Sequence, residues 1–134
     1  MPGFDDLVTA ARRARERASA PYSRFHVGAA IQAADGRIFT GCNVESASYG
    51  LTMCAERVAL FKAVSEGARA FTAVAVVADT ANPTPPCGAC RQVLWEHCGD
   101  VPVMLANLER VAGEYRMATL LPLPFDGRLI GTGE

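Results

Sequence analysis

Long apolar runs are missing from this chain of 134 residues. Its longest apolar stretches, Phe71–Ala78 and Val101–Ala106, are interrupted by Thr72 and Pro102 and fall far short of the roughly 20 residues that cross a bilayer. The N-terminal residues carry acids where a secretion signal needs bases and an apolar segment, so we expect no such signal. We therefore expect no membrane span and no export, and we expect the protein to work in the cytoplasm.

An excess of positive charge is also absent, since 13 Lys and Arg face 14 Asp and Glu. Binding to nucleic-acid phosphates depends on such an excess, so a dedicated nucleic-acid binder is not expected. Apolar residues make up 50% of the chain and charged residues 20%, which excludes a disordered protein. The length fits a single domain, residues 1–134, with a core of its own.

Cysteine is scarce and odd in number, with five residues. In the reducing compartment expected for a protein without an export signal, thiols bind metals or catalyse reactions more often than they form disulfides.

Hydrophobic periodicity and turn residues predict helices alternating with strands, which is typical of a three-layer α/β domain around one sheet. The apolar run at 71–78 indicates a buried central strand. Asp35-Gly36 predicts a two-residue hairpin turn with positive φ angles. Residues 120–134 are expected to form a packed arm. The expected helices are 4–18, 52–66 and 87–98, and the expected strands are 25–33, 37–43, 71–78, 101–106 and 114–118.

Two short segments carry the chemistry. Cys54-Ala55-Glu56 opens the second expected helix, and Pro86-Cys87-Gly88-Ala89-Cys90 opens the third. Residues three apart in a helix face the same side, so Cys87 and Cys90 can hold one ion, and Cys54 can complete a three-thiolate site where the helix starts meet. Helix N-termini favour the thiolate form. Three protein ligands leave the fourth tetrahedral position of Zn²⁺ open to water, as in catalytic sites.

Glu56 follows Cys54 by two residues, an offset that places its carboxylate beside the metal without ligating it. A free carboxylate next to a metal-bound water transfers protons. For the C-x-x-C pair alone, half of a structural zinc site or a thioredoxin-type redox pair is the simpler interpretation. Glu56 favours the catalytic one. Counting alone leaves a closed site open, because four further residues could supply a fourth ligand: Cys42, Cys98, His26 and His97.

Four sequence blocks resemble the cytidine deaminases of the small, homotetrameric, zinc-dependent class. They read PYSRFHVGA at 21–29, GCNVE at 41–45, CAER at 54–57 and PCGACRQ at 86–92, in the family's order and with compatible spacing. The resemblance covers nearly the whole chain and implies a three-layer α/β/α cytidine deaminase-like fold with a central mixed five-stranded sheet. It also implies hydrolytic deamination of cytidine and deoxycytidine to uridine and deoxyuridine plus ammonia, a reaction of pyrimidine salvage.

The resemblance assigns roles to individual residues. It implies one Zn²⁺ per chain bound by three thiolates, with Glu56 as the catalytic proton carrier. It implies that Asn43 and Glu45 hold the ribose 3′-hydroxyl and that Phe25 packs on the pyrimidine face. From the residues alone, a core strand position for Phe25 and turn chemistry for the other two are the simpler interpretations. The remaining residues that it places in the zinc and substrate sites are Cys54, Cys87, Cys90, Val44 and Ala55.

Three thiolates and one Zn²⁺ sum to a charge of −1, which weakens the metal as a Lewis acid. A guanidinium that donates to the sulfurs would withdraw charge from them. The resemblance gives Arg57 this role. Arg91 is a second candidate, and an ordinary solvated helix arginine is the alternative interpretation.

Two positions depart from the family pattern. Ser46 stands where the family usually has Asn, and Phe125-Asp126-Gly127 stands where it commonly has Phe-Gly-Pro. In relatives that Phe reaches a neighbouring subunit's active site, so Phe125 is the expected counterpart in a homotetramer. We expect Tyr49 at a subunit boundary, the alternative being a loop aromatic that covers the core.

The other cysteines and the histidines are expected to be peripheral to the chemistry. Cys42 is predicted to be a small buried hydrophobe, Cys98 is a candidate reactive thiol, and His26 and His97 are predicted to be structural or surface groups.

Two other functions compete with the favoured one. One is a related enzyme that acts on blasticidin S, free cytosine or a polynucleotide base, and the other is a non-catalytic zinc module with four ligands. Asn43 and Glu45 favour a sugar, and the charge balance disfavours a polynucleotide. The expected partner is therefore a small-molecule nucleoside.

Overall fold

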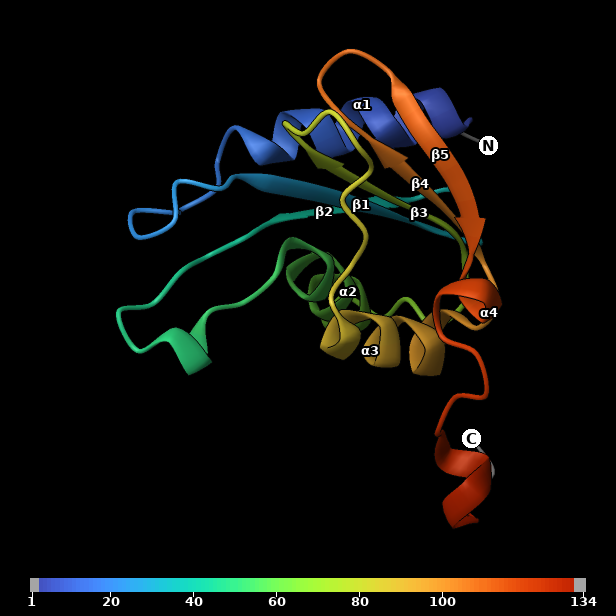
Figure 1. The fold of residues 1–134 in the computed structure, drawn as a ribbon. Helices are drawn as coiled ribbons and strands as arrows, with labels where there is room; N and C mark the ends of the chain where they lie inside the picture. The colour runs from blue at the N-terminus through green and yellow to red at the C-terminus, as the bar shows by residue number, and fades with distance from the viewer. Residues whose placement is uncertain (1–2, 132–134) are drawn as a thin grey trace.

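The computed structural model describes residues 3–131, in which five strands form one mixed sheet in the order β2-β1-β3-β4-β5 (Figure 1). The β3–β4 pair is parallel and the other three pairs are antiparallel. The strands are β1 (Val27–Ala33), β2 (Ile38–Cys42), β3 (Phe71–Ala78), β4 (Pro102–Ala106) and β5 (Val111–Arg116).

Helices cover both faces of this sheet, which gives the predicted three-layer α/β/α fold. Helix α1 (Phe4–Arg15) lies on one face, and α2 (Ala55–Ser65) and α3 (Gly88–Cys98) lie on the other (Figure 1). Alternate residues of a strand point to opposite faces. Burial on both sides therefore explains why β1 and β3 are almost continuously apolar.

Helix α1 ends at Arg15, three residues earlier than predicted. The chain leaves the helix because Ser19 pairs with the loop that follows β2. The Ser19 N–H donates to the Asn43 carbonyl at 3.0 Å, and the Ser19 carbonyl accepts from the Glu45 N–H at 2.8 Å. This pairing draws the segment before β1 towards the same end of the sheet as the loop after β2.

The turn between β1 and β2 is longer than the predicted two-residue turn. Only Gly36 has a positive φ, of 94°. Its N–H donates to the Ala33 carbonyl at 3.0 Å, and the Ala33 N–H donates to the Arg37 carbonyl at 2.8 Å. Three residues therefore connect the strands, as in a turn closed by one left-handed glycine, and Asp35 has no need of a positive φ.

Strand β5 begins three residues before its predicted start. Asn107 causes the shift, because its side-chain Oδ1 accepts from the N–H groups of Glu109 and Arg110 at 2.9 Å each and turns the chain directly after β4. The short helix α4 (Met117–Leu120) occupies the end of the predicted strand. Two short 3₁₀ segments, η1 (Tyr49–Leu51) and η2 (Gly127–Ile130), complete the regular structure of the described residues.

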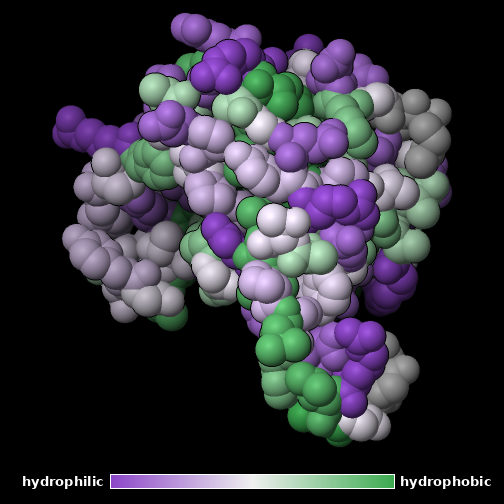
Figure 2. Space-filling model, turned by 45° about the vertical axis from the view of Figure 1, so that its right-hand side comes forward, coloured by the Kyte–Doolittle hydropathy of each residue, from purple (hydrophilic) through white to green (hydrophobic). Residues whose placement is uncertain are grey.

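The C-terminal segment extends away from the body of the molecule, and Figure 2 shows a hydrophobic projection there. Its exposed apolar side chains are Leu123, Phe125, Leu129 and Ile130. The prediction that residues 120–134 form a packed arm is thus wrong for the single chain. Residues 132–134 of the predicted arm lie outside the described residues. Among residues 3–131, no helix has the length and apolar composition needed to cross a membrane.

Candidate active site

The starts of α2 and α3 meet at one end of the sheet and bring three cysteines together. Cys54 and Cys87 are the N-cap residues of α2 and α3, so each directly precedes the first residue of its helix. Their carbonyls accept the first helical hydrogen bonds, from Val58 at 3.1 Å and from Arg91 at 2.9 Å. Cys90 lies within the first turn of α3, so all three thiols sit where the helix dipoles favour negative charge.

The three sulfurs are spaced for a tetrahedral metal ion. Cys87 Sγ lies 3.8 Å from Cys54 Sγ and 3.5 Å from Cys90 Sγ. Zinc–sulfur bonds of about 2.3 Å in a tetrahedron separate two sulfurs by roughly 3.8 Å, whereas a disulfide needs about 2.05 Å. The geometry fits Zn²⁺ and excludes the disulfide form of a redox pair in this structure.

No fourth protein ligand joins this group. Within residues 3–131, the three cysteines are the one group of three or more potential ligand side chains close enough to share an ion. Neither histidine belongs to it, and neither do Cys42 and Cys98. The closed four-ligand alternative therefore lacks a ligand in the described chain, and Zn²⁺ held here keeps one position for water or substrate.

Arg57 faces the thiols, as predicted. Its Nη2 donates to Cys54 Sγ at 3.4 Å, and its Nε is buried without a hydrogen-bond partner among the described residues. Hydrogen bonds from the Cys90 thiol and from Arg57 lower the pKa of Cys54 to about 5, while the proton shared with Cys54 raises the pKa of Cys90. The guanidinium is therefore placed to balance thiolate charge.

Arg91 does not contribute to this balance. Its guanidinium donates instead to the carbonyls of Pro86 at 2.7 Å and Leu120 at 2.8 Å. Arg91 thus fixes the loop before α3 and the end of α4.

Glu56 is buried beside the sulfurs and is not one of the ligands. Only 4% of its surface is exposed, and this burial, reinforced by the charge of Cys54, raises the pKa of Glu56 to about 7. A carboxyl group that takes up and releases protons near neutrality suits general acid–base chemistry.

A cavity of about 190 Å³ lies next to the metal centre. Val27 and Val76 from the sheet, two metal ligands and Glu56 share its wall. The full set of lining residues is Phe25, Val27, Asn43, Thr52, Cys54, Ala55, Glu56, Val76, Thr84, Pro85 and Cys87.

Phe25 lines this cavity from outside the sheet. It precedes β1 and is 42% exposed, so the core-strand interpretation is wrong. The physical reason lies in its neighbours. Arg24 has a positive φ of 59°, which breaks the strand, and the Asn43 Nδ2 holds the Phe25 carbonyl at 2.7 Å. The apolar alternation around Phe25 does not indicate this turn.

Asn43 and Glu45 hold the segment before β1 in place. Asn43 Oδ1 accepts from the Val27 N–H at 2.9 Å. Glu45 Oε1 accepts from the N–H groups of Tyr22 at 2.9 Å and Ser23 at 3.1 Å, and these bonds together with that from the Ser23 hydroxyl lower the pKa of Glu45. The turn chemistry is thus confirmed. Asn43 lines the cavity, whereas Glu45 lines an adjoining hollow of about 370 Å³ that shares Thr52 with it.

The two remaining substrate candidates on this side differ in position. Ala55 is fully buried and lines the cavity. Val44 is 46% exposed and pairs with Met53 through two backbone hydrogen bonds of 2.9 Å, without lining the cavity. Val44 therefore anchors the loop that carries its neighbours.

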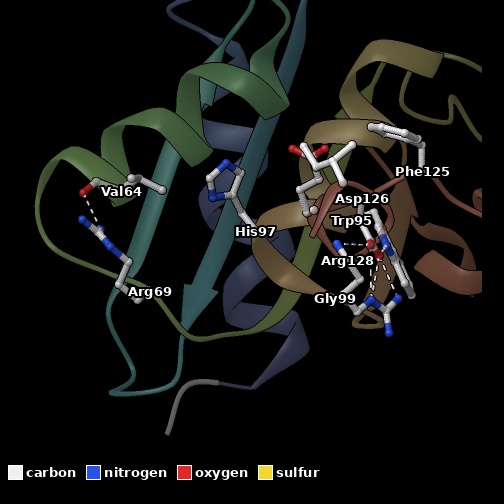
Figure 3. Close-up of a pocket in the computed structure, with 11 residues that line it drawn as sticks. Val64, Arg69, Trp95, His97, Gly99, Phe125, Asp126 and Arg128 are labelled. Atoms are coloured by element: carbon white, nitrogen blue, oxygen red, sulfur yellow. Dashed lines mark hydrogen bonds and ion pairs between the residues drawn. The ribbon is translucent and has the colours of Figure 1, made fainter. Parts of the chain in front are cut away.

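Tyr49 and Phe125 lie outside the cavity of their own chain. Tyr49 is 75% exposed and packs edge-on against Tyr22, so it does not cover the core. Phe125 borders a separate hollow of about 680 Å³, where Asp126 accepts from Trp95 Nε1 at 3.2 Å (Figure 3). The Phe125 carbonyl accepts from Gln92 at 2.6 Å. These bonds to α3 hold the segment Phe125-Asp126-Gly127, which differs from the Phe-Gly-Pro that is common in the family.

The prediction for Cys42 is wrong, and the candidate reactivity of Cys98 is not supported. Cys42 is half-buried at the end of β2 and borders a surface hollow instead of filling the core. Burial raises the pKa of Cys98 to about 12, so this thiol stays protonated at neutral pH and is not a reactive thiolate.

Sequence reasoning missed five residues of the cavity wall, namely Val27, Thr52, Val76, Thr84 and Pro85. Pro85 stands two residues before the first cysteine of the C-x-x-C pair, so the stiff loop preceding a ligand motif was an available signal. Thr52 had none, because its contact is non-local within the loop: its Oγ1 accepts from the Ser46 N–H at 3.1 Å. Ser46 stands where the family usually has Asn. Its Oγ accepts from the Ser48 N–H at 3.1 Å, and this bond holds the loop in place.

Comparisons with known proteins agree with this geometry. Residues 4–105 match the family described as the cytidine and deoxycytidylate deaminase zinc-binding region. The chain is 54% identical over 122 residues to a cytidine deaminase of Sporosarcina psychrophila, covering 90% of each chain. It is 57% identical over 120 residues to one of Halalkalibacterium halodurans, covering 89% of this chain and 91% of the relative.

Solved structures give the same result for the fold. The crystal structure of a cytidine deaminase from Burkholderia pseudomallei superposes with a TM-score of 0.88 at 49% identity, covering 92% of this chain and all of that chain.

Proposed function

The chain belongs to the cytidine and deoxycytidylate deaminase family, and from this premise we infer that it is a zinc-dependent hydrolase that deaminates cytidine and deoxycytidine to uridine and deoxyuridine. The observation that carries this conclusion is the three-thiolate cluster with a buried, unligated Glu56 next to it in one cavity. A closed structural zinc site has no use for such a carboxyl group.

Glu56 moves the protons of the reaction. Zinc, when bound by the three thiolates, supplies a Lewis acid that lowers the pKa of water to about 7. Glu56 accepts a proton from the attacking water and passes it to N3 of the pyrimidine, which makes C4 more electrophilic. The hydroxide adds to C4, and Glu56 then takes the proton of the new C4 hydroxyl and delivers it to the amine, which leaves as ammonia while C4 becomes a carbonyl. Arg57 offsets the charge of the thiolates throughout.

Phe25, Asn43 and Glu45 bind the nucleoside. The exposed Phe25 ring offers a flat face to the pyrimidine. Among the described residues, Asn43 uses one of its two amide hydrogens and Glu45 uses three of about four acceptor sites. The 3′-hydroxyl of the sugar can therefore accept from Asn43 and donate to Glu45. Ala55 closes the cavity next to the base, and Val44 holds the loop.

A homotetramer completes the site. The cavity of about 190 Å³ is smaller than the roughly 300–1,000 Å³ of sites that enclose a small molecule, and Phe25 in its wall is 42% exposed. The projecting C-terminal segment offers Phe125, 55% exposed, to another copy. In this arrangement Phe125 closes a neighbour's substrate site and Tyr49 lies at a subunit boundary.

Two further parts of the proposal rest on the chain itself. The described residues form a single domain, supported by the one sheet that the five strands share. The enzyme works in the cytoplasm, supported by three thiols whose role requires a reducing environment.

A panel of four substrates tests the proposed function. Zinc-loaded protein is assayed with cytidine, deoxycytidine, free cytosine and blasticidin S. We expect turnover of both nucleosides and little of the other two. Turnover of blasticidin S or cytosine in preference to cytidine would contradict the proposal that Asn43 and Glu45 bind a sugar. If none of the four compounds is turned over, the proposed deaminase activity is contradicted.

A further inference from the structure

The segment Ser23–Phe25, which leads into β1, is held in a conformation that its sequence does not favour. Arg24 has a φ of 59°, in the left-handed region that residues other than glycine seldom adopt. Such a conformation persists only where the surroundings impose it. The Ser23 side chain, which helps to hold this conformation, also contacts residues proposed to bind the nucleoside.

The Ser23 hydroxyl makes two of these contacts at once. It donates to Glu45 Oε2, and it accepts from the Phe25 N–H at 3.0 Å. A hydroxyl can do both because it has one hydrogen and two lone pairs. One atom therefore connects the carboxylate proposed for the sugar with the backbone of the aromatic residue proposed for the base.

Phe25 is fixed on both sides by this network. Its N–H is bound by Ser23 Oγ at 3.0 Å and its carbonyl by Asn43 Nδ2 at 2.7 Å. The residue is 42% exposed, so the direction of its ring depends in large part on the backbone. Loss of the Ser23 contact would free the N–H side while leaving the carbonyl side in place.

Glu45 is oriented in the same way. Oε1 already accepts two backbone N–H groups, whereas the Ser23 hydroxyl is the donor to Oε2 among the described residues. Its bond fills one of the two acceptor sites of Oε2 and leaves the other for a ligand hydroxyl. Without it, the exposed carboxylate can turn towards solvent.

We propose that Ser23 is a positioning residue for the nucleoside: its hydroxyl fixes the Glu45 carboxylate for the sugar 3′-hydroxyl and the Phe25 backbone for the pyrimidine. This inference rests on the proposed function. It assigns Ser23 no contact with the reacting atoms, so its removal acts on substrate binding and selectivity rather than on proton transfer by Glu56.

The test compares cytidine with 3′-deoxycytidine as substrates of zinc-loaded Ser23→Ala. Since a hydrogen bond to a charged group is lost, we expect kcat/KM for cytidine to fall about tenfold, chiefly through KM, with kcat within about threefold of wild type. The loss for 3′-deoxycytidine is smaller, because the contact with Glu45 is already missing there. The ratio of the two kcat/KM values therefore shrinks, while zinc content and Tm stay unchanged.

Matched variants complete the experiment. Ser23→Thr keeps the hydroxyl and should restore the ratio. Ser65→Ala removes a serine that donates only to the Lys62 carbonyl, at the end of α2, and should leave the ratio unchanged. If Ser23→Ala does not fold, Ser23→Cys carries the comparison, since it keeps the shape with a much weaker donor.

An unchanged substrate ratio in the hydroxyl-less variant would overturn the proposal, as would a loss confined to kcat. Failure of the proposed function is recognised separately, because wild-type protein would then not deaminate cytidine at all.

Discussion

Gly41 sets the distance between α2 and the sheet, and its replacement by alanine should disturb the metal centre. A Cβ on Gly41 would lie 2.5 Å from the Ala55 carbonyl oxygen and 2.5 Å from the Ala59 nitrogen. Both are backbone atoms of α2, so no flexible side chain can move aside. The start of this helix carries Cys54 and Glu56.

The size of the effect follows from these distances. Ordinary Cβ contacts begin at 3.4 Å, so α2 must retreat by roughly 0.9 Å in Gly41→Ala. Overpacking of this kind destabilises a protein by about 1–3 kcal/mol. Cys54 moves with α2 whereas Cys87 and Cys90 stay with α3, and metal–ligand distances tolerate only about 0.2 Å. We therefore expect zinc affinity to fall at least tenfold.

Three measurements check this prediction: the free energy of unfolding in urea, zinc affinity by competition with a chelator, and turnover of cytidine. The matched control is Gly88→Ala, which adds the same methyl group to the first turn of α3, where nothing lies within 4 Å. That variant should be as stable as wild type or slightly more so. Wild-type stability and zinc affinity in Gly41→Ala would refute the close packing of α2 on β2.

Three further changes have expected outcomes. Arg57→Ala should bind zinc about 10–100-fold more weakly in a chelator competition, because the thiolate charge loses its partner, and unaltered affinity would contradict that role. Complete removal of zinc should abolish deamination and lower Tm, with both restored by added Zn²⁺; an active apoprotein would contradict metal dependence. The raised pKa of Cys98, about 12, keeps its thiol neutral as pH rises from 7 to 9, so iodoacetamide should modify it about a thousandfold more slowly in native than in unfolded protein. Mass spectrometry of the tryptic peptide 92–110, in which Cys98 is the one cysteine, follows this reaction; equal rates would contradict the burial.

The zinc centre was predictable because its information is local. Cys87 and Cys90 are three residues apart, and Cys54 stands near the start of the predicted helix 52–66, so helix geometry brings each thiol to a helix start. The family resemblance implied that the starts of the two helices meet, and the sulfur distances confirm it. The position of Glu56 follows from its offset in the same way.

The edges of the substrate site were not predictable from periodicity. Phe25 alternates with its neighbours like a strand residue, yet Arg24 turns the chain before β1. The cause is a pair of non-local hydrogen bonds: Asn43 Nδ2 donates to the Phe25 carbonyl, and Glu45 Oε1 accepts from the Ser23 N–H. No local pattern reveals them. Strand β5 was misplaced for a related reason, since the turn at Asn107 depends on its side chain accepting from the next residues.

Turnover of cytidine by Glu56→Gln, with zinc content and folding determined on the same sample, tests whether Glu56 carries the protons of the reaction. Glutamine keeps the size of the buried side chain and cannot carry the proton. We expect a folded protein with one Zn²⁺ per chain, a wild-type near-ultraviolet spectrum and deamination slower by at least a hundredfold. Deamination at the wild-type rate by this variant would contradict the role of Glu56 and, with it, the mechanism.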